Sequence, residues 1–438
     1  MGAQVKEKKL LSIKGLLRLS RRCFTSVDEP KKHTDGISIA DCLMAGLAIF
    51  GLKIPSLLQY DDQIEHEIIS HNLKTLYGIQ KAASDTFLRE RLDNIDPQQL
   101  RPAFRTIFAA LQRGKVLEEY EFIDGYYLMP CDGTGVFSSE KVHCENCCEK
   151  HHKDGRVSYY HQFLAAVIVH PDHKEVFPLF PEAILKQDGA KKNDCERNAC
   201  VRFLEGFRKE HPHLKVIMTS DALGSNGPNI LNLKRYDIRF IIGVKPDGNE
   251  TLFDWLKGIK PEELHISQNG SSFVYKWFNG IPLNNTYPDL NVNFFECIET
   301  TSKGEVKHFT WVTDFIVTPS NVSTLSKGGR ARWKIENETF NTLKNQGYHF
   351  EHNYGHGYKN LSQVFSILMF LAFLIDQVQQ RSCGMFQAAL KTAKRKMWFW
   401  SRMRALFTTF EILSWSDLYL AIANGLGMTR LMPLQRPP

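Results

Sequence analysis

Two short apolar runs in the middle of the chain each lead into an aspartate. Residues 126–130 precede Asp132 and residues 214–218 precede Asp221, and both runs are rich in residues that favour β-strands. An acid that follows a buried strand lies at the edge of the sheet, beside its counterparts on adjacent strands. Carboxylates held close together repel one another unless a cation neutralises them, and hard divalent cations prefer oxygen ligands. The pattern therefore predicts a β-sheet with a divalent-metal site at one edge.

The sequence around these two acids predicts a mixed α/β domain over residues 121–350. Because strand-like and helix-like segments alternate, a compact sheet with helices on its faces is the expected architecture. A stretch rich in turn residues, 245–321, predicts a β-rich insertion in this domain. The expected strands are 126–130, 163–169, 175–180, 214–218 and 238–244, and the expected helices are 194–209 and 229–234.

Helical patterns dominate both ends of the chain, residues 1–120 and 351–438. The clearest N-terminal helix starts at Asp96, an N-cap whose partner in a capping box is Gln99. Pro102 is expected to kink this helix or to restart it. The whole chain is thus predicted to be an α/β protein with a β-rich insertion and helical flanking regions.

Basic residues gather in the first 35 positions and again between residues 391 and 404. Each group can be a solvated surface or a contact to DNA phosphates. We expect DNA binding to reside in the N-terminal region, and the aromatic C-terminal stretch to pack internally or to join protomers. The net charge of +7 is compatible with a polyanionic partner.

The composition, with 43% hydrophobic and 24% charged residues, is that of a globular protein. Its most apolar run, residues 364–375, is too short to cross a bilayer and predicts a buried core helix, so no membrane partner is expected. The N-terminus lacks the apolar segment and cleavage site of a secretory signal. We therefore expect a cytoplasmic, nucleoid-associated protein whose ten cysteines are largely unpaired.

A third acid lies on a helix that is expected to run from Gly329 to about residue 346. Arg332 and Glu336 are four residues apart and share one face of this helix, and Lys344 lies two turns beyond Glu336. Taken alone, this pattern also fits a structural helix with a surface ion pair. Its place after the two aspartates gives it more weight.

Three motifs in this order carry a resemblance to a known family: DGTG from Asp132, TSD ending at Asp221, and RWKIEN, which contains Glu336. Over residues 55–377 the chain resembles the DDE transposases of bacterial insertion sequences, specifically the insertion-sequence-4-like family. The resemblance implies an RNase H-like catalytic core. It also implies that the β-rich insertion separates the last strand of this core from the helix with the third acid.

The resemblance implies a DNA transposase that cleaves transposon ends and transfers them into target DNA. Asp132, Asp221 and Glu336 would be the catalytic residues and would hold Mg²⁺ or Mn²⁺ in a two-metal mechanism. Arg332 and Lys344 would contact DNA. The implied partners are the double-stranded transposon ends and target DNA, bound by a homodimer.

The sequence departs from the family in the helix with the third acid. The family has a Tyr three residues before the Arg and a Lys seven residues after the Glu, where this chain has Gly329 and Leu343, with Lys344 one place later. The missing Tyr puts in doubt a hairpin-forming route of cleavage. Two alternatives stay open: an inactive DNA-binding protein derived from a transposase, and an RNase H-like nuclease without strand transfer. The complete set of three acids favours the active enzyme.

A second candidate metal site lies in a short segment rich in cysteine and histidine. Cys144 and Cys147 have the spacing with which two thiolates grip one Zn²⁺, and His152 (or its neighbour His151) and His161 can complete a tetrahedral structural site. A reduced hairpin in which the cysteines only pack is the alternative interpretation.

A further group of histidines, at positions 349, 352 and 356, is expected to hydrogen-bond to the backbone of a loop, or else to contact DNA phosphates.

Overall fold

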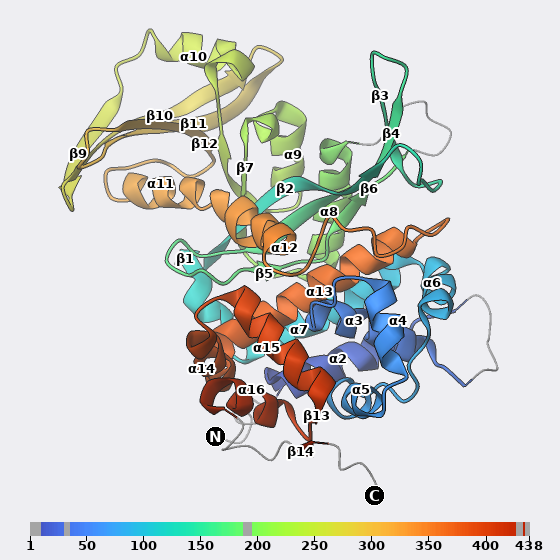
Figure 1. Cartoon of the computed structure of the whole chain (residues 1–438). Coiled ribbons are helices and arrows are strands. Elements are labelled where there is room, and N and C mark those ends of the chain that lie inside the picture. Colours follow the sequence, from blue (N-terminus) through green and yellow to red (C-terminus); the bar gives the residue numbers. More distant parts are fainter. Residues whose placement is uncertain (1–9, 30–35, 187–194, 426–431, 434–438) are drawn as a thin grey trace, which may run out of the picture.

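A long mixed β-sheet forms the frame of the protein (Figure 1). The computed structural model describes residues 10–29, 36–186, 195–425 and 432–433. The strands of the sheet pair in the order β3-β4-β2-β7-β8-β12-β11-β10-β9, with β1 beside β2, and β5 and β6 beside β4. Their bounds are β1 Glu121–Ile123, β2 Tyr126–Ser139, β3 Cys148–His151, β4 Val157–Ile168, β5 Phe177–Pro178, β6 Glu182–Ile184, β7 Val216–Ser220, β8 Arg239–Gly243, β9 Glu262–Gln268, β10 Ser271–Asn284, β11 Tyr287–Thr300 and β12 Val306–Thr313.

Strand β2, third in this order, runs antiparallel to β4 on one side and parallel to β7 on the other. Next to β7 lies β8, also parallel. The helices α8 (Glu196–Glu210) and α9 (Gly227–Arg235) pack against β4 and β6, and against β8, respectively. The mixed α/β fold predicted for this part of the chain is thus confirmed.

The strand that carries Asp132 is longer than predicted. Its parallel pairing with β7 ends at Pro130, but β2 continues beside β4 as far as Ser139, so Asp132 lies within the strand and pairs with Ala165. The sequence signal stopped earlier because the residues after Cys131 are small and polar. Asp132 still lies at an edge, since β7 ends at Ser220 and leaves this part of β2 uncovered on that side.

The β-rich character expected of residues 245–321 is present, and these residues form a lobe that extends the main sheet. The lobe consists of the helix α10 (Glu250–Leu256) and strands β9 to β12, which form a meander of long antiparallel strands. Its last strand, β12, pairs antiparallel with β8 through Trp311↔Gly243, Val312↔Ile242 and Thr313↔Ile241. Because of this pairing, the insertion and the central strands share a single sheet.

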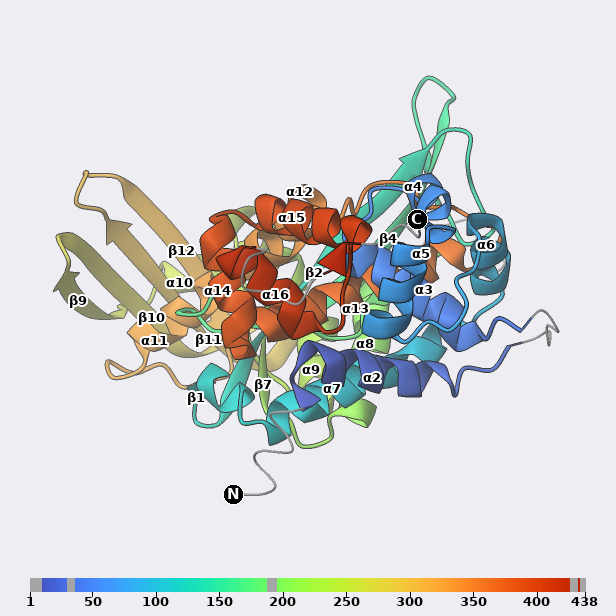
Figure 2. The same cartoon turned by 60° about the horizontal axis from the view of Figure 1, so that its bottom comes forward.

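The two ends of the chain form one helical body beneath the sheet (Figures 1 and 2). Its central helix, α13, contacts helices from the N-terminal region as well as α14, and α15 contacts α5. The N-terminal helices are α2 Ile13–Phe24, α3 Ile39–Gly51, α4 Leu57–Ile64, α5 Glu67–Asn72, the π-helix η1 Leu73–Tyr77, α6 Asp85–Asp93, the 3₁₀ helix η2 Pro97–Leu100, α7 Arg101–Arg113 and the 3₁₀ helix η3 Leu117–Tyr120. The C-terminal elements are α13 Leu361–Ser382, α14 Gly384–Ala393, α15 Lys396–Thr409, β13 Phe410–Glu411, α16 Trp415–Asn424 and β14 Met432–Pro433.

The sequence predicts that Pro102 either kinks or restarts a helix, and in the structure a new helix starts there. The 3₁₀ helix η2 comes first, and α7 then begins at Arg101 with Pro102 in its first turn. Asp96 caps η2 by accepting a hydrogen bond from the backbone N–H of Gln98. The expected capping box does not form, because the side chain of Gln99 instead bonds the backbone N–H and C=O of Asp28.

The apolar run near residue 364 belongs to α13, which at 22 residues is longer than predicted. By length and hydropathy this helix could span a membrane, and its whole apolar window is buried inside the protein. Packing on all sides by other parts of the chain is what the core-helix interpretation predicts.

The basic residues of the N-terminus divide into two groups. Lys14, Arg18 and Arg22 are exposed on α2, whereas Arg21 forms an ion pair with Asp41. Lys6, Lys8, Lys9, Lys31 and Lys32 lie outside the described residues.

Candidate active site and candidate metal centre

The two aspartates lie at the same level of neighbouring strands. Pro130 of β2 pairs with Thr219 of β7 in a parallel register, and Asp132 and Asp221 each follow two residues later. Asp221 comes directly after the end of β7 and caps the short 3₁₀ helix η4 (Ala222–Gly224), because its Oδ1 accepts a hydrogen bond from Leu223 N at 3.0 Å. Asp132 and Asp221 thus lie at the same edge of the sheet, as the sequence predicts.

Glu336 is brought to Asp132 by a helix that packs on β2. An Nη1 atom of Arg332 lies 2.7 Å from Glu336 Oε1 and 3.4 Å from Asp132 Oδ2, so a single guanidinium bridges the two carboxylates. The Arg332 side chain is largely buried and lies against the Trp333 ring, 4.7 Å from its centroid. The sequence resemblance predicts that Arg332 contacts DNA. In this structure its guanidinium pairs with the carboxylates of Asp132 and Glu336.

Burial and neighbouring acids both raise the pKa of Asp132. Burial, and to a smaller extent the charges of Glu336 and Glu196, raise the pKa of this carboxyl to about 6, although the Gly133 backbone N–H and Arg332 act to lower it. A carboxylate that is costly to ionise here is one that a bound cation would stabilise. The electrostatics of the site therefore favour a cation.

A fourth acid, Glu196, lies in the same place and was missed by sequence reasoning. Its carboxylate accepts a hydrogen bond from Gln162 Nε2 at 3.0 Å, and burial followed by the charge of Asp221 raises its pKa. A Cβ atom on Gly133 would lie 2.1 Å from Glu196 Oε1, so the glycine makes room for this carboxylate. A Glu in the first turn of a helix is common for reasons of helix dipole alone, so the sequence held no signal that set it apart.

The helix with Glu336 is not the single regular helix that was predicted. An α-helix, α11 (Val322–Arg330), starts earlier than expected, and after a turn the chain forms a π-helix, η6 (Ile335–Phe340), and then α12 (Asn341–Asn345). The backbone N–H of Asn341 bonds to the carbonyl of Glu336, five residues earlier. A π-turn therefore lies at Glu336, and such turns are frequent at functional sites.

The π-turn accounts for the shifted lysine. It holds one more residue per turn than an α-helix, so a residue eight positions after Glu336 takes the place that a seventh would take in a regular helix. Leu343, the seventh, is fully buried, whereas Lys344 reaches the surface and pairs with Glu351 at 2.7 Å. The π-turn thus explains why the eighth residue after Glu336, and not the seventh, reaches the surface.

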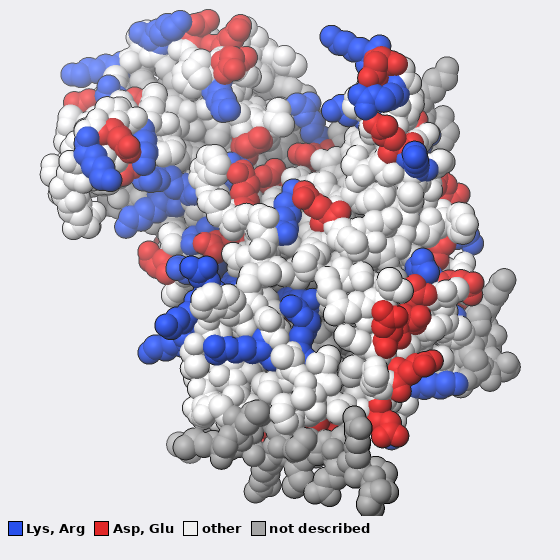
Figure 3. Space-filling model, in the orientation of Figure 1, with Lys and Arg blue, Asp and Glu red and all other residues white. Residues whose placement is uncertain are grey.

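Acidic side chains gather in a hollow between the β-rich lobe and the helical body (Figure 3). Basic side chains lie below this hollow on the same face, over α14 and α15. The exposed basic residues of these two helices and the turn between them are Lys391, Lys394, Arg395 and Arg402. The hollow and the basic surface together have the charge pattern that a polyanion with divalent cations would require.

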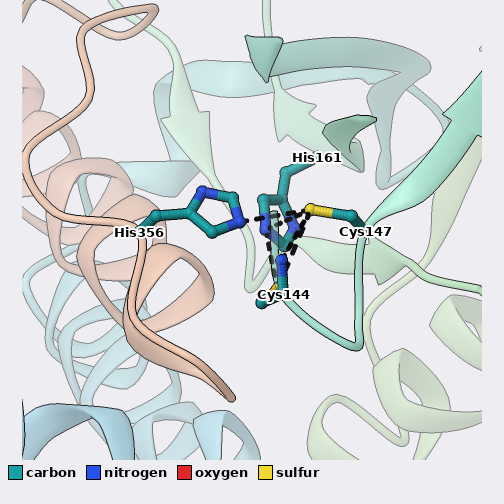
Figure 4. Close-up of side chains that lie close together, drawn as sticks. All are labelled: Cys144, Cys147, His161 and His356. Carbon is teal, nitrogen blue, oxygen red and sulfur yellow. Dashed lines mark hydrogen bonds between the residues drawn. The ribbon is translucent and has the colours of Figure 1, made fainter. Parts of the chain in front are cut away.

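Side chains of the cysteine–histidine segment form a tight cluster with a histidine from another part of the chain (Figure 4). The ligand atoms of Cys144, Cys147, His161 and His356 all lie within 4.8 Å of one another, and all four residues are buried. Among the described residues it is the only such group of potential metal ligands, so the acids around Asp132 are spread more widely.

Three of the four residues predicted for zinc are in this cluster, and His152 is not. Its Nε2 atom pairs with Ser158 Oγ at 2.7 Å, near the tip of the hairpin formed by β3 and β4. The fourth position is taken by His356, which comes from the loop before α13. Sequence reasoning placed His356 in a group of loop histidines, because no local pattern connects it with a cysteine 209 residues away.

The other two histidines of that group stay near each other. Burial, and next the charge of His352, lower the pKa of His349, and His352 packs against the Tyr354 ring at 5.0 Å.

No family model matches the sequence, and no curated protein matches it. Among solved structures, the chain is similar to a chain of the cryo-EM structure of the piggyBac transposase synaptic complex with hairpin DNA. The similarity covers 96% of this chain and 80% of that chain, with a TM-score of 0.39 and 10% sequence identity. A similarity at this level carries no argument about activity, which rests on the geometry of the residues described above.

Proposed function

We propose that this protein is a metal-dependent DNA transposase, which cleaves DNA at transposon ends and joins the freed ends to target DNA. The main support for the proposal is that Asp132 and Glu336 both contact the guanidinium of Arg332. Asp221 lies at the same level, at the end of the adjacent parallel strand. These acids come from three distant parts of the sequence. Bringing these carboxylates together does not stabilise the fold, because like charges repel one another, so their proximity indicates a function.

We also propose that β4, β2, β7 and β8 form an RNase H-like core, the fold that the sequence motifs imply. The support for this is the place of β2 between one antiparallel and one parallel neighbour, and the position of the first two acids on β2 and after β7. In this proposal the β-rich lobe is an insertion between β8 and the helix with Glu336.

The donor set of the site fits Mg²⁺ or Mn²⁺, because it consists of carboxylate oxygens in a place where burial opposes uncompensated negative charge. Asp132, Asp221 and Glu336 would hold the ions, which when bound supply charge neutralisation at the phosphate and a more acidic attacking hydroxyl. Arg332 keeps two of the carboxylates in position. Lys344 contacts a phosphate of the DNA backbone.

The proposed reaction has two steps at phosphorus, a hydrolysis and then a transesterification. Water first attacks the phosphodiester at the element's end, a new P–O bond forms, and the P–O3′ bond breaks to leave a 3′-hydroxyl. This hydroxyl then attacks a phosphodiester of the target, and the target's own 3′-oxygen leaves. The carboxylates would hold the cations, and the protein aligns the attacking and leaving oxygens. This positioning, together with the neutralisation of charge, is the protein's main task in phosphoryl transfer.

The test is a cleavage assay on duplex DNA taken from both flanks of the coding sequence, with Mg²⁺ present. We expect Asp132→Asn, Asp221→Asn and Glu336→Gln each to lower cleavage by more than about 100-fold, beyond the effect typical of outer residues of a metal site. The control is Glu338→Gln, which alters a neighbouring acid on another side of the same helix and should cleave nearly as well as the unmodified protein. Cleavage that is undiminished in EDTA would overturn the proposal.

A second substrate separates the alternatives. On DNA with a pre-formed 3′-hydroxyl at the element's end, a transposase joins the end to target DNA, whereas a nuclease leaves it unjoined. Binding of the ends without cleavage or joining would instead identify an inactive DNA-binding protein.

A further inference from the structure

We propose that Cys144, Cys147, His161 and His356 bind one structural Zn²⁺ ion, which fastens the sheet to the start of the central helix α13. The site is independent of the proposed transposase activity. It differs from a local zinc knuckle because one ligand comes from a distant part of the chain.

Four of the six distances within the cluster are close to the edges of a tetrahedral zinc site, and all six are within 4.8 Å. Zinc bonds of about 2.3 Å to sulfur and about 2.0 Å to nitrogen give tetrahedral edges of about 3.8 Å between two sulfurs and about 3.5 Å between sulfur and nitrogen. The two sulfurs of Cys144 and Cys147 are 3.8 Å apart. His161 Nε2 lies 3.4 Å from Cys144 Sγ and 3.5 Å from Cys147 Sγ, and His356 Nε2 lies 3.2 Å from Cys147 Sγ.

The orientation of the four side chains points to a common centre. Figure 4 shows both imidazoles turning a ring nitrogen toward the sulfurs, with His356 coming from the left, Cys147 from the right, His161 from above and Cys144 from below. All four side chains are buried, with exposed fractions between 1% and 8%. Two thiols and two imidazoles in a dry site have few other ways to satisfy their polar atoms.

The backbone around the cysteines supports thiolate ligands. Cys147 N donates a hydrogen bond to Cys144 O at 3.2 Å, which closes a tight turn, and Cys144 N points at Cys147 Sγ at 3.5 Å. The Cys144 N–H, which points at a sulfur, stabilises negative charge on that sulfur. The neighbouring Cys148 is turned away, and its Sγ donates to the carbonyl of Ile184 at 3.4 Å.

Because His356 comes from a distant segment, zinc would connect two parts of the chain. The loop with His356 is also held by Asn146, whose side chain donates to Lys359 O at 2.7 Å, and by Asp93, which accepts hydrogen bonds from the backbone N–H groups of residues 358–361. Zinc would add a strong bond between this loop and the strand β4. All four coordination positions would be filled by protein, which is typical of structural zinc.

The experiment measures zinc in the full-length protein, purified without chelators, by elemental analysis. We expect about one Zn per chain, as for a single closed site. His356→Asn and Cys147→Ser should each lose most of it, and replacement of zinc by cobalt should give the visible bands of a tetrahedral thiolate site. The matched control is His152→Asn, which removes the histidine that the sequence favoured and should keep the full zinc content.

If the variants fold poorly, the unmodified protein decides the question. A thiol-specific mercurial should release the zinc to a chromogenic chelator, and hydrogen exchange in residues 352–361 should speed up as the zinc leaves. Protein that contains no zinc and has freely reactive thiols at positions 144 and 147 would overturn the proposal. Full zinc in His356→Asn, with loss in His152→Asn, would overturn the link to α13.

Discussion

Single residues set the size of the carboxylate site. Gly133 has space for no side chain, because the carboxylate of Glu196 and the amide of Gln162 occupy the position of a Cβ atom. The sequence motif thus includes a glycine for a steric reason. The contact also ties the strand with Asp132 to the first turn of α8.

The substitution Gly133→Ala tests this contact. The added methyl group should displace Glu196 and lower the stability by about 1–3 kcal/mol, as expected for overpacking. The double substitution Gly133→Ala with Glu196→Ala should regain most of the loss, because the displaced carboxylate is gone. Thermal unfolding of the two variants measures the effect. An unchanged melting temperature in the single variant would show that Glu196 moves aside freely.

The raised pKa of Asp132 predicts how metal binding depends on pH. Because this pKa is about 6, the carboxyl is protonated below that pH and a cation must displace the proton. Affinity for Mn²⁺ should therefore fall by up to about tenfold per pH unit below about pH 6, and level off above it. The folded-state pKa lies above the ordinary value of 3.8, so without metal this group makes the fold less stable as pH rises from about 4 through about 6.

Calorimetric titration with Mn²⁺ at several pH values measures this dependence, and Asp132→Asn provides the comparison. The variant should bind more weakly and lose most of the pH dependence. An affinity that stays constant across this range in the unmodified protein would contradict the prediction.

Among the secondary-structure elements, the π-helix η6 has the greatest effect on the site. It adds one residue between Glu336 and Lys344, and this insertion keeps both on the same side of the helix. Such a turn is less favourable than a regular α-helix. Its position at the third acid indicates that it serves the site.

Deletion of Asn337, an exposed residue of the π-turn, tests this interpretation. Removal of one residue should restore regular α-helical hydrogen bonds, so we expect the chain to fold with a stability that is equal or higher. Because the deletion changes the turn of the helix between Glu336 and the residues after it, the carboxylate of Glu336 should move away from Asp132, and DNA cleavage should fall by more than about 100-fold. Circular dichroism and the cleavage assay give the two readouts. Retained cleavage would show that the π-turn is dispensable.

For the whole molecule, a buried ion pair joins the two ends of the chain. Lys53, from the N-terminal region, places its Nζ 2.6 Å from Asp376 Oδ2 on α13, and the rings of Tyr348 and Trp400 lie 4.0 Å and 4.1 Å from the same Nζ. The Tyr348 hydroxyl donates a second hydrogen bond to Asp376. The lysine is fully buried, and burial lowers its pKa.

Replacement of Lys53 alone should lower the free energy of unfolding more than replacement of both Lys53 and Asp376. Lys53→Met leaves Asp376 buried without its cation and should cost about 3–5 kcal/mol, whereas Lys53→Met combined with Asp376→Leu should cost much less. Denaturant unfolding of the full-length chain, followed by tryptophan fluorescence, compares the two. Equal losses in both variants would mean that the pair contributes through packing alone.

The sequence by itself determined the local elements and the identity of the first candidate residues. The strands that lead to Asp132 and Asp221, the restart of a helix at Pro102 and the β-rich character of residues 245–321 all follow from patterns within a few residues. Such patterns are readable because strand and helix periodicity, and the conformational limits of proline and glycine, act locally.

Only the tertiary structure decided which distant residues meet. Glu196 lies beside Asp132 because α8 packs against the strands around it, His356 displaces His152 from the cysteine cluster because its loop is fastened beside β4, and β12 joins the lobe to β8. These contacts depend on the packing of whole elements and on backbone hydrogen bonds between them. No short stretch of sequence encodes such contacts, because each one depends on surfaces that form only when the chain has folded.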